Sequence, residues 1–543
     1  MTNPLLTLDH VSLVLPNGNS LFTDISYTFA PHRIGLVGRN GVGKSVLARI
    51  LAGELEPTTG TCTRAGTVYY LAQLVSDQRQ QTVAGLAGVQ PALDALERVE
   101  AGSTNAADFD LIAERWDLRQ RLTAELTRHQ LDHVQPETPV SSLSGGEAMR
   151  VALIGAVLSE ADFLILDEPS NHLDQPGRQA LIRQLQDWHK GLLVISHDRM
   201  LLDTMQTIVE LSPLGLQSYG GNYTFYHQQK KQERASAEAR LEQRKLERRR
   251  EKQKQQLLHD RHSHRAANNA RQAKTANQAK ILLDRGKERS HRSSAKLRQQ
   301  QLAARDANDQ LIREAAAKIA LEAEIVLHAS PGRQNQRQQI VLLDDVVLPF
   351  LVDRHAPINL KLSGGQRIAV LGANGSGKST LLKVIAGELE PESGHCQRFV
   401  EATYLDQRLN TLRSEQTVIE QLQAVNPVTD KTTLRTWLAQ LGLDASRLAI
   451  AAGKLSGGER MKAALALVLY AAEPPQLLLL DEPDNHLDLN SVQALETMLN
   501  QYRGTMMVVS HDEAFLSQLG LTHRLRAGCS GWQLEDSVES SSW

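Results

Sequence analysis

Cysteine is scarce in this 543-residue chain, which contains only Cys62, Cys396 and Cys529. Three scattered cysteines cannot supply a zinc cluster, an iron–sulfur cluster or a disulfide framework. No run reaches the roughly 18 consecutive apolar residues that a membrane helix needs. The nearest candidate, Met461–Leu480, is interrupted by a glutamate and two prolines. The N-terminus also lacks the basic start and apolar run of a secretory signal. We therefore expect a soluble, cytoplasmic protein.

The length and composition indicate several globular units. Hydrophobic residues make up 41% of the chain and charged residues 22%, which excludes a collagen-like, wholly disordered or small disulfide-rich protein. At roughly 100–200 residues per domain, two to four units are expected, each able to bury its own core.

Charge and helix breakers divide the chain. Residues 214–330 lack proline and hold a single glycine after Gly221, which predicts a long helix or a helix pair. Between Arg240 and Arg305 lie 20 Lys+Arg and 6 Asp+Glu, whereas the remainder holds 40 and 56. The sequence thus predicts a basic helical linker between two mixed segments. The predicted parts are 1–226, 227–330 and 331–543.

The two outer segments repeat each other. GRNGVGKS, ending at Ser45, matches GANGSGKS, ending 334 positions later at Ser379, and Gln73 matches Gln407 at the same offset. Two cysteines also share this offset, so they are expected to be equivalent small core positions and not a disulfide. Later motifs lie 312–314 positions apart. The first copy therefore carries about 20 extra residues, within 75–140.

Each repeat contains a strand, a glycine-rich loop of the form G-x-x-x-x-G-K-S and an apolar helix. A single match could be a chance glycine-rich turn, but two with equal spacing to later motifs favour phosphate-binding loops. The fold class expected is α/β, with two P-loop NTPase domains. Lys44 and Lys378 would reach the β- and γ-phosphates, and Ser45 and Ser379 would ligate Mg²⁺. The predicted loop residues are Gly38, Asn40, Gly41, Gly43, Lys44 and Ser45, then Gly372, Asn374, Gly375, Gly377, Lys378, Ser379 and Thr380.

Two carboxylates follow a second apolar strand in each copy, in FLILDEP and LLLLDEP. An Asp-Glu pair at a strand end is ordinarily solvated charge. Beside a phosphate loop, Asp167 and Asp481 are predicted to hold Mg²⁺, and Glu168 and Glu482 to orient or deprotonate the attacking water.

The phosphate loop, Gln, LSGGE, DEP, NHLD and SHD occur twice in one order, and over roughly four-fifths of the chain they resemble the ATP-binding-cassette family. The resemblance implies two cassettes closing head to tail over two ATP molecules. It also implies that Gln73 and Gln407 are metal ligands. His197 and His511 would contact the γ-phosphate, although a lone histidine after an apolar strand is more often structural. The expected composite sites join the Lys44 loop to Ser456, Gly457 and Gly458, and the Lys378 loop to Ser144, Gly145 and Gly146.

Two departures from the family pattern concern the cassette edges. LSGGQR at Leu362–Arg367 imitates the signature, but it precedes the phosphate loop and is interpreted as a turn. The adenine-stacking aromatic is Phe350 in the second copy, whereas Leu15 stands at the comparable position of the first. Phe22 is a candidate substitute.

The linker narrows the family further. A soluble twin cassette with a basic helical linker resembles the F subfamily (ABC-F), proteins of translation whose linker hairpin enters the ribosome near the tRNA exit site. The resemblance implies ribosomal RNA and tRNA as partners, a monomer with paired cassettes, and no membrane subunit. The alternative is a fused ATPase subunit that energises a membrane transporter. Stalled-ribosome rescue, initiation, assembly and antibiotic resistance all remain open.

Within the linker, residues 259–280 contain no Leu, Ile, Val, Met or aromatic residue, so this segment cannot anchor itself in a core. Two arms of about 30–40 residues would reach roughly 45–60 Å at 1.5 Å per residue. The alternative to an RNA-binding segment is a solvated charged spacer. The candidate RNA-binding residues are Arg261, Arg265, Arg271, Lys274 and Lys280.

Overall fold

The structure is a computed structural model. It describes residues 6–16, 18, 20–72, 81–171, 173–275, 338–350, 357–406, 411–443, 445–485, 487–528 and 531–536. The chain forms two compact units, one made of Met1–Tyr226 with Ile325–Trp543 and the other of His227–Glu324. The first unit contains both cassettes, and the second is the linker.

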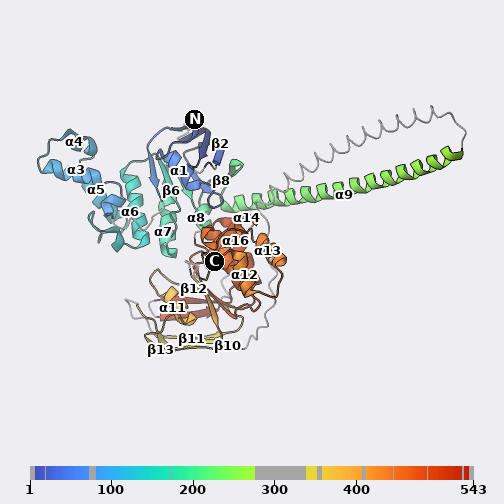
Figure 1. The fold of residues 1–543 in the computed structure, drawn as a ribbon. Coiled ribbons are helices and arrows are strands. Elements are labelled where there is room, and N and C mark those ends of the chain that lie inside the picture. The colour runs from blue at the N-terminus through green and yellow to red at the C-terminus, as the bar shows by residue number, and fades with distance from the viewer. Residues whose placement is uncertain are drawn as a thin grey trace. The chain divides into compact units, whose positions relative to one another are not determined.

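A six-stranded sheet forms the centre of the first cassette (Figure 1). Its strand order is β5-β6-β7-β3-β8-β9. Its first five strands are parallel and β9 is antiparallel. Every residue of β6 and β7 is buried, as expected of apolar strands covered on both faces. The strands are β3 (Arg33–Val37), β5 (Val68–Leu71), β6 (Phe163–Asp167), β7 (Gly191–Ile195), β8 (Thr207–Ser212) and β9 (Gly215–Gly220).

The second cassette repeats this sheet in the order β14-β15-β16-β12-β17-β18, again with only its last strand antiparallel. The duplication predicted from the motif offsets is therefore present in the fold. The strands are β12 (Arg367–Leu371), β14 (Ala402–Leu405), β15 (Leu477–Asp481), β16 (Thr505–Val509), β17 (His523–Gly528) and β18 (Gly531–Asp536).

Each cassette also has a three-stranded antiparallel sheet, β2-β1-β4 or β11-β10-β13. Cys62 pairs with Leu8 and Cys396 with Leu343, so these two half-buried cysteines occupy equivalent positions, as predicted. The third cysteine lies outside the described residues. LSGGQR spans the turn between β11 and β12, which confirms its interpretation. The strands are β1 (Leu6–Val14), β2 (Ser20–Phe29), β4 (Thr59–Arg64), β10 (Gln339–Val347), β11 (Ile358–Ser363) and β13 (Ser393–Arg398).

Helices accompany the sheets of both cassettes. In the first cassette they are α1 (Lys44–Ala52), α2 (Val83–Leu86), α3 (Gln90–Glu100), α4 (Ala106–Ile112), α5 (Leu118–Arg128), α6 (Gly145–Leu158), α7 (Gln175–Gln186) and α8 (Arg199–Asp203). In the second they are α11 (Lys378–Ala386), α12 (Val418–Val425), α13 (Lys431–Gln440), α14 (Ala445–Leu448), α15 (Gly457–Leu469), α16 (Leu489–Gln501) and α17 (Glu513–Gln518). No helix among the described residues is long and apolar enough to span a membrane.

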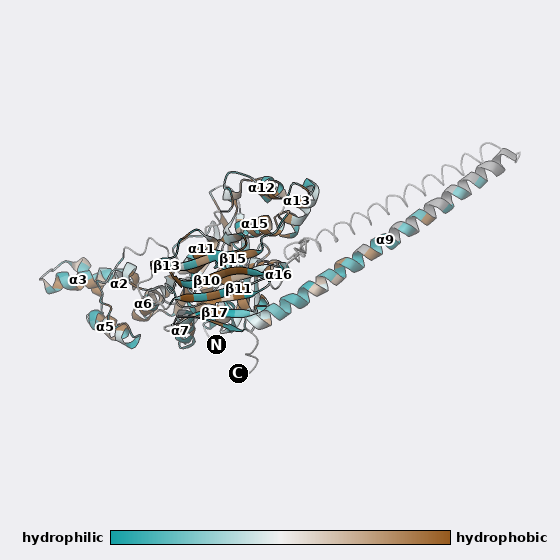
Figure 2. Cartoon of the chain, turned by 90° about the horizontal axis from the view of Figure 1, so that it is seen from below, coloured by the Kyte–Doolittle hydropathy of each residue, from teal (hydrophilic) through white to brown (hydrophobic). Residues whose placement is uncertain are grey.

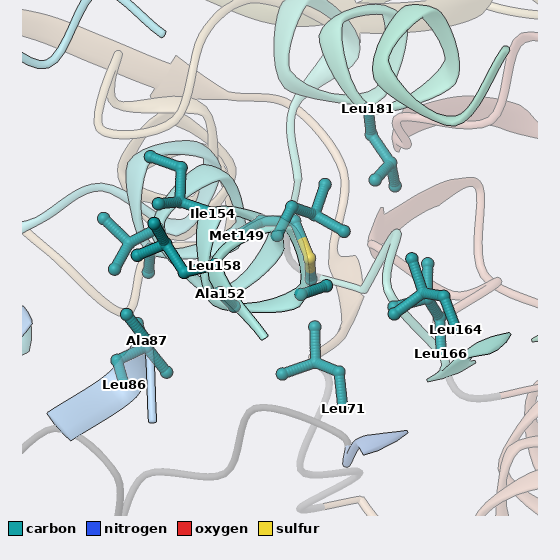
Figure 3. Packing of buried hydrophobic residues seen from close by; sticks show 14 of the residues in the cluster. Leu71, Leu86, Ala87, Met149, Ala152, Ile154, Leu158, Leu164, Leu166 and Leu181 are labelled. Atoms are coloured by element: carbon teal, nitrogen blue, oxygen red, sulfur yellow. The ribbon is translucent and has the colours of Figure 1, made fainter. Parts of the chain in front are cut away.

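The helix that follows the first LSGGE motif packs into the core of its cassette. Met149 and Ala152 of α6 lie among Leu71 of β5, Leu166 of β6 and Leu181 of α7 (Figure 3). Because nine of the 14 residues of α6 are buried, a shift of its first turn would disturb the whole cluster. The start of α6 is thereby held at a fixed position.

The extra residues of the first copy fold as an arm made of α3 and α4. Thr82 and Thr417 cap α2 and α12 at equivalent positions, and α5 corresponds to α13. In the second copy only the short segment 426–430 connects α12 to α13. In the first copy α3 and α4 lie between α2 and α5. Buried Asp108 in α4 accepts hydrogen bonds from Arg98 and Ser103, which fixes the two arm helices together.

The linker begins with α9 (Tyr223–Thr275), a single helix of 53 residues. It is longer than the predicted arm, because the sequence carries no proline or glycine to end it and because it starts inside the first cassette. At 1.5 Å per residue it spans about 80 Å. Its residues are predominantly hydrophilic (Figure 2), and Leu246 and Leu257 are exposed. The expected second arm lies outside the described residues.

Candidate functional site

The phosphate loops connect a central strand to a helix in both cassettes. Gly43 and Gly377 precede α1 and α11 with φ values of 104° and 89°, in the left-handed region that side chains disfavour. Lys44 Nζ donates to the carbonyls of Gly38 and Arg39 at 2.7 and 3.2 Å. In the second copy, the Lys378 ammonium donates to two loop carbonyls at 2.8 and 2.9 Å. Each loop thus surrounds its own buried cation at a helix N-terminus, an arrangement suited to polyphosphate.

Burial sets the electrostatics of these lysines. It lowers the pKa of Lys44, although Glu168, Asp488 and Asp167 oppose the change. It also lowers the pKa of Lys378. A bound polyanion would favour the charged ammonium and offset this desolvation.

An aspartate at the end of a central strand contributes to each site. Asp481 accepts hydrogen bonds from Ser379 Oγ at 3.1 Å and from the Tyr404 hydroxyl at 2.9 Å. Asp167 accepts one from Tyr70 at 3.4 Å, and burial raises its pKa. Among the described residues, Asp167 Oδ1 is buried without a hydrogen-bond partner. This set of hydroxyl and carboxylate oxygens fits Mg²⁺.

Each glutamate after the aspartate is held in an unusual backbone conformation. Glu168 and Glu482 both have φ of 50°, and their amides donate to the carbonyls of Ile195 and Val509. The turn brings Glu168 Oε1 to 3.4 Å from His197 Nε2. The equivalent pair, Glu482 and His511, is separated by 3.7 Å.

These acids and histidines are strongly perturbed by burial. Burial raises the pKa of Glu168 to about 8, and it also raises that of Glu482. It lowers the pKa of His197 to about 3 and that of His511 to about 4, so both imidazoles are neutral at pH 7. Each centre can therefore offer a carboxyl group with a raised pKa and an uncharged hydrogen-bonding ring.

The signature serines begin the helices α6 and α15. Ser144 accepts from the amide of Glu147, whose carboxylate accepts from the Ser144 amide in return. Ser456 and Glu459 form the same capping box. Part of the LSGGE pattern is thus explained by helix capping, which leaves Gly145, Gly146, Gly457 and Gly458 in the first turns.

Hydrogen bonds join the two cassettes at the phosphate loops. The Asn40 amide donates to Asp488 at 2.9 Å, and the Asn374 amide donates to Asp174 at 3.4 Å. Lys462 of α15 interacts electrostatically with Asp488 of its own cassette and with Arg39 of the first cassette. Each loop is therefore approached by the segment that follows DEP in the other cassette. Asp174 and Asp488 were absent from the sequence-based site, although their shared offset of 314 could have suggested them.

The predicted adenine-stacking residues and glutamine ligands have different outcomes in the structure. Phe22 is 4% exposed in the core beneath the first loop, so the expectation that it could stack on adenine is wrong. Phe350 is 85% exposed. Gln73 and Gln407 lie outside the described residues. Tyr70 and Tyr404 were missed, although they repeat at the 334-residue offset.

Comparisons with known proteins agree with this geometry. The family model described as "ABC transporter" matches residues 22–171 and 355–485. The "Probable ATP-binding protein YheS" of Haemophilus influenzae is 32% identical, over 93% of this chain and 77% of the relative. The "Energy-dependent translational throttle protein EttA" of the same organism is 30% identical, over 97% of this chain and 92% of the relative.

A solved structure shares the fold. It is titled "Crystal structure of the complex of archaeal ribosomal stalk protein aP1 and archaeal ribosome recycling factor aABCE1". The match has a TM-score of 0.57 at 18% identity and covers 97% of this chain and 90% of that one. The duplicated phosphate loops, paired acids and matching relatives lead to one assignment. The chain belongs to the ATP-binding-cassette family, in its ABC-F subfamily, and is an ATP-hydrolysing enzyme.

Proposed function

We propose that this ABC-F ATPase is a cytoplasmic factor that binds the ribosome when both sites hold ATP and leaves after hydrolysis. The relative called a translational throttle protein, which matches nearly the full chain, supports a role in translation. The observation that carries the proposal is α9, which combines 15 Lys+Arg with 6 Asp+Glu in one long helix. Such a long basic helix suits a phosphate-rich partner.

Two composite ATP sites are part of this proposal. Site one joins Lys44, Ser45, Asp167, Glu168 and His197 to the signature of the second cassette, Ser456–Gly458. Site two joins Lys378, Ser379, Asp481, Glu482 and His511 to Ser144–Gly146. The contacts of Asp488 with Asn40 and of Asp174 with Asn374 support this head-to-tail pairing.

The residues divide the chemistry among themselves. Lys44 and Lys378 bind the β- and γ-phosphates, while the loop amides and helix N-termini orient them. Ser45, Asp167, Ser379 and Asp481 would hold Mg²⁺, with Gln73 and Gln407 as predicted further ligands. When bound, Mg²⁺ neutralises charge on the phosphates.

Water activation falls to the glutamates. Burial raises the pKa of Glu168 to about 8, which matches this carboxyl group to accept a proton from the attacking water, and burial also raises the pKa of Glu482. The neutral imidazoles of His197 and His511 then donate hydrogen bonds to the γ-phosphate without bringing an extra charge.

The distal half of α9 is proposed to meet ribosomal RNA or tRNA near the tRNA exit site. In the proximal half basic residues pair with acids, as in Arg234–Glu238 and Arg244–Glu247. No acidic residue of α9 follows Asp260, whereas Arg261, Arg265, Arg271 and Lys274 do. Arg261 is exposed. The fifth candidate, Lys280, lies outside the described residues.

Replacing Arg261, Arg265, Arg271, Lys274 and Lys280 with Gln tests this role. Gln preserves helix propensity, so the substitution isolates charge. Binding of ATP-trapped protein to purified ribosomes should weaken, and the slope of log affinity against log salt should flatten by roughly 0.7–0.9 per lost phosphate contact. Basal ATPase should persist. An unchanged affinity and slope would favour the spacer alternative, and recovery with membranes instead of ribosomes would favour a transporter subunit. A matched control replaces the paired Arg234 and Arg244 with Gln.

A further inference from the structure

One arginine contacts three of the loops that surround the two ATP sites. Arg178 projects from α7, and its Nε donates to the carbonyl of Leu173 at 3.2 Å, in the segment after DEP of its own cassette. Its Nη1 lies 3.4 Å from Asp198 Oδ2, beside His197. The same Nη1 donates at 3.4 Å to the carbonyl of His511, in the other cassette. The Arg178 side chain is only 14% exposed.

Buried acids surround this guanidinium. Asp198 caps α8 and is 6% exposed, and burial raises its pKa even though Arg178 opposes the change. Asp484 in the second cassette has its pKa raised to about 7 by burial and by Asp512, again against the effect of Arg178. The positive charge of Arg178 therefore offsets carboxylates from both cassettes.

The contact made by Arg178 has no counterpart at the equivalent position of the second cassette. The offset of 314 that relates His197 to His511 relates Arg178 to Val492, which is buried in the apolar core of the second cassette. The second cassette therefore has no guanidinium at the equivalent position. A residue needed only for the cassette fold would be expected in both copies, whereas Arg178 is present only where it can reach across.

We propose that Arg178 is a positioning residue that fixes the two histidine loops against each other and thereby couples hydrolysis at site two to the first cassette. It touches neither the phosphate loops nor the signature serines in its hydrogen bonds, so it acts through His511 and the neighbouring Glu482. This inference rests on the proposed composite sites. Displacing the His511 carbonyl would move its imidazole away from the γ-phosphate, and small misplacements of this kind slow chemistry more than binding.

The test measures hydrolysis at site two alone. Glu168→Gln silences site one, and single-turnover hydrolysis in that background reports the site built on Glu482. Adding Arg178→Gln should slow this step about tenfold or more, while ATP affinity, measured with a fluorescent ATP analogue, changes little. Arg178→Lys should recover part of the rate because it keeps the charge. Arg183→Gln, an exposed position on the same helix, is the matched control and should match the parent.

Three results would overturn the coupling. They are an unchanged rate at site two, a loss confined to site one when that site is measured in the Glu482→Gln background, and a fall in ATP affinity as large as the fall in rate. Thermal unfolding of each variant shows whether the fold is retained, and Arg178→Lys supplies the folded comparison if Arg178→Gln is unstable. Failure of the proposed sites gives a different signature, because Glu168→Gln with Glu482→Gln would then still hydrolyse ATP.

Discussion

Glu168 and Glu482 have the same strained backbone in two copies that differ widely in sequence. A φ of 50° is uncommon for a residue with a side chain and costs of order 1 kcal/mol or more. In each case the backbone amide donates a hydrogen bond to a carbonyl of the next strand, and this bond stabilises the strained conformation. The strained turn brings each carboxylate beside its histidine. Strain repeated at both centres is consistent with a requirement of the chemistry.

The two buried histidines should make the stability of the protein depend on pH. Their pKa values of about 3 and 4 lie below the usual 6.5, so between roughly pH 4 and 6.5 the unfolded chain binds protons that the folded chain does not. Stability should therefore fall as the pH drops through this range. At pH 5 each histidine should lower the free energy of unfolding by roughly 2 kcal/mol relative to its value at neutral pH.

Thermal unfolding of His197→Gln with His511→Gln, measured from pH 7.5 to 5, checks this prediction. The variant should lose less stability on acidification than the parent, because Gln does not titrate. His189→Gln, at an exposed position, serves as the control and should follow the parent. Parallel curves for the parent and the double variant would mean that the buried imidazoles accept protons freely.

Among the elements, those with local signals were the predictable ones. The glycine-rich loops, the apolar strands before Asp167 and Asp481, and the helical start of the linker follow from short-range patterns. The environment of Phe22 could not be predicted, because its burial depends on pairing with Leu13 across β1 and β2. The length of α9 was underestimated, because no local residue marks where a charged helix ends.

Contacts between the cassettes were also beyond sequence reasoning. Arg178 looks like any surface arginine on an amphipathic helix, and only docking of the second cassette brings the His511 carbonyl to it. Equal offsets identify equivalent positions, but they do not report which positions meet. The same limitation hid the contacts of Asp174 and Asp488 with the opposite loops.

Of the two described cassettes, only the first contains the arm made of α3 and α4. The second cassette completes the same fold without it, so the arm should be dispensable for ATP chemistry. Replacing residues 91–117 with the shorter segment 426–430 should keep basal ATPase within about twofold of the parent, since insertions of this kind are tolerated. ATPase and thermal unfolding are the measurements. A folded variant that has lost its ATPase would show that the arm supports the first site.

In the whole molecule, the proposed function assigns ATP chemistry to one unit and ribosome binding to the other. The cassettes contain the loops, acids and histidines, whereas the linker helix carries concentrated positive charge and few apolar residues. A nucleotide can bias ribosome binding only as far as it binds the closed cassette pair more tightly than the open one. Trapping ATP should therefore trap the ribosome-bound state.

Sedimentation of the Glu168→Gln, Glu482→Gln variant with purified ribosomes shows whether ATP traps the ribosome-bound state, because the substitution keeps the phosphate loops and signatures but removes the groups that activate water. With ATP, the variant should pellet with ribosomes and show no steady-state hydrolysis, whereas with ADP it should remain in the supernatant. The proposed function would be contradicted if the variant remained in the supernatant in the presence of ATP and ribosomes. Hydrolysis of ATP at the parental rate would also contradict it.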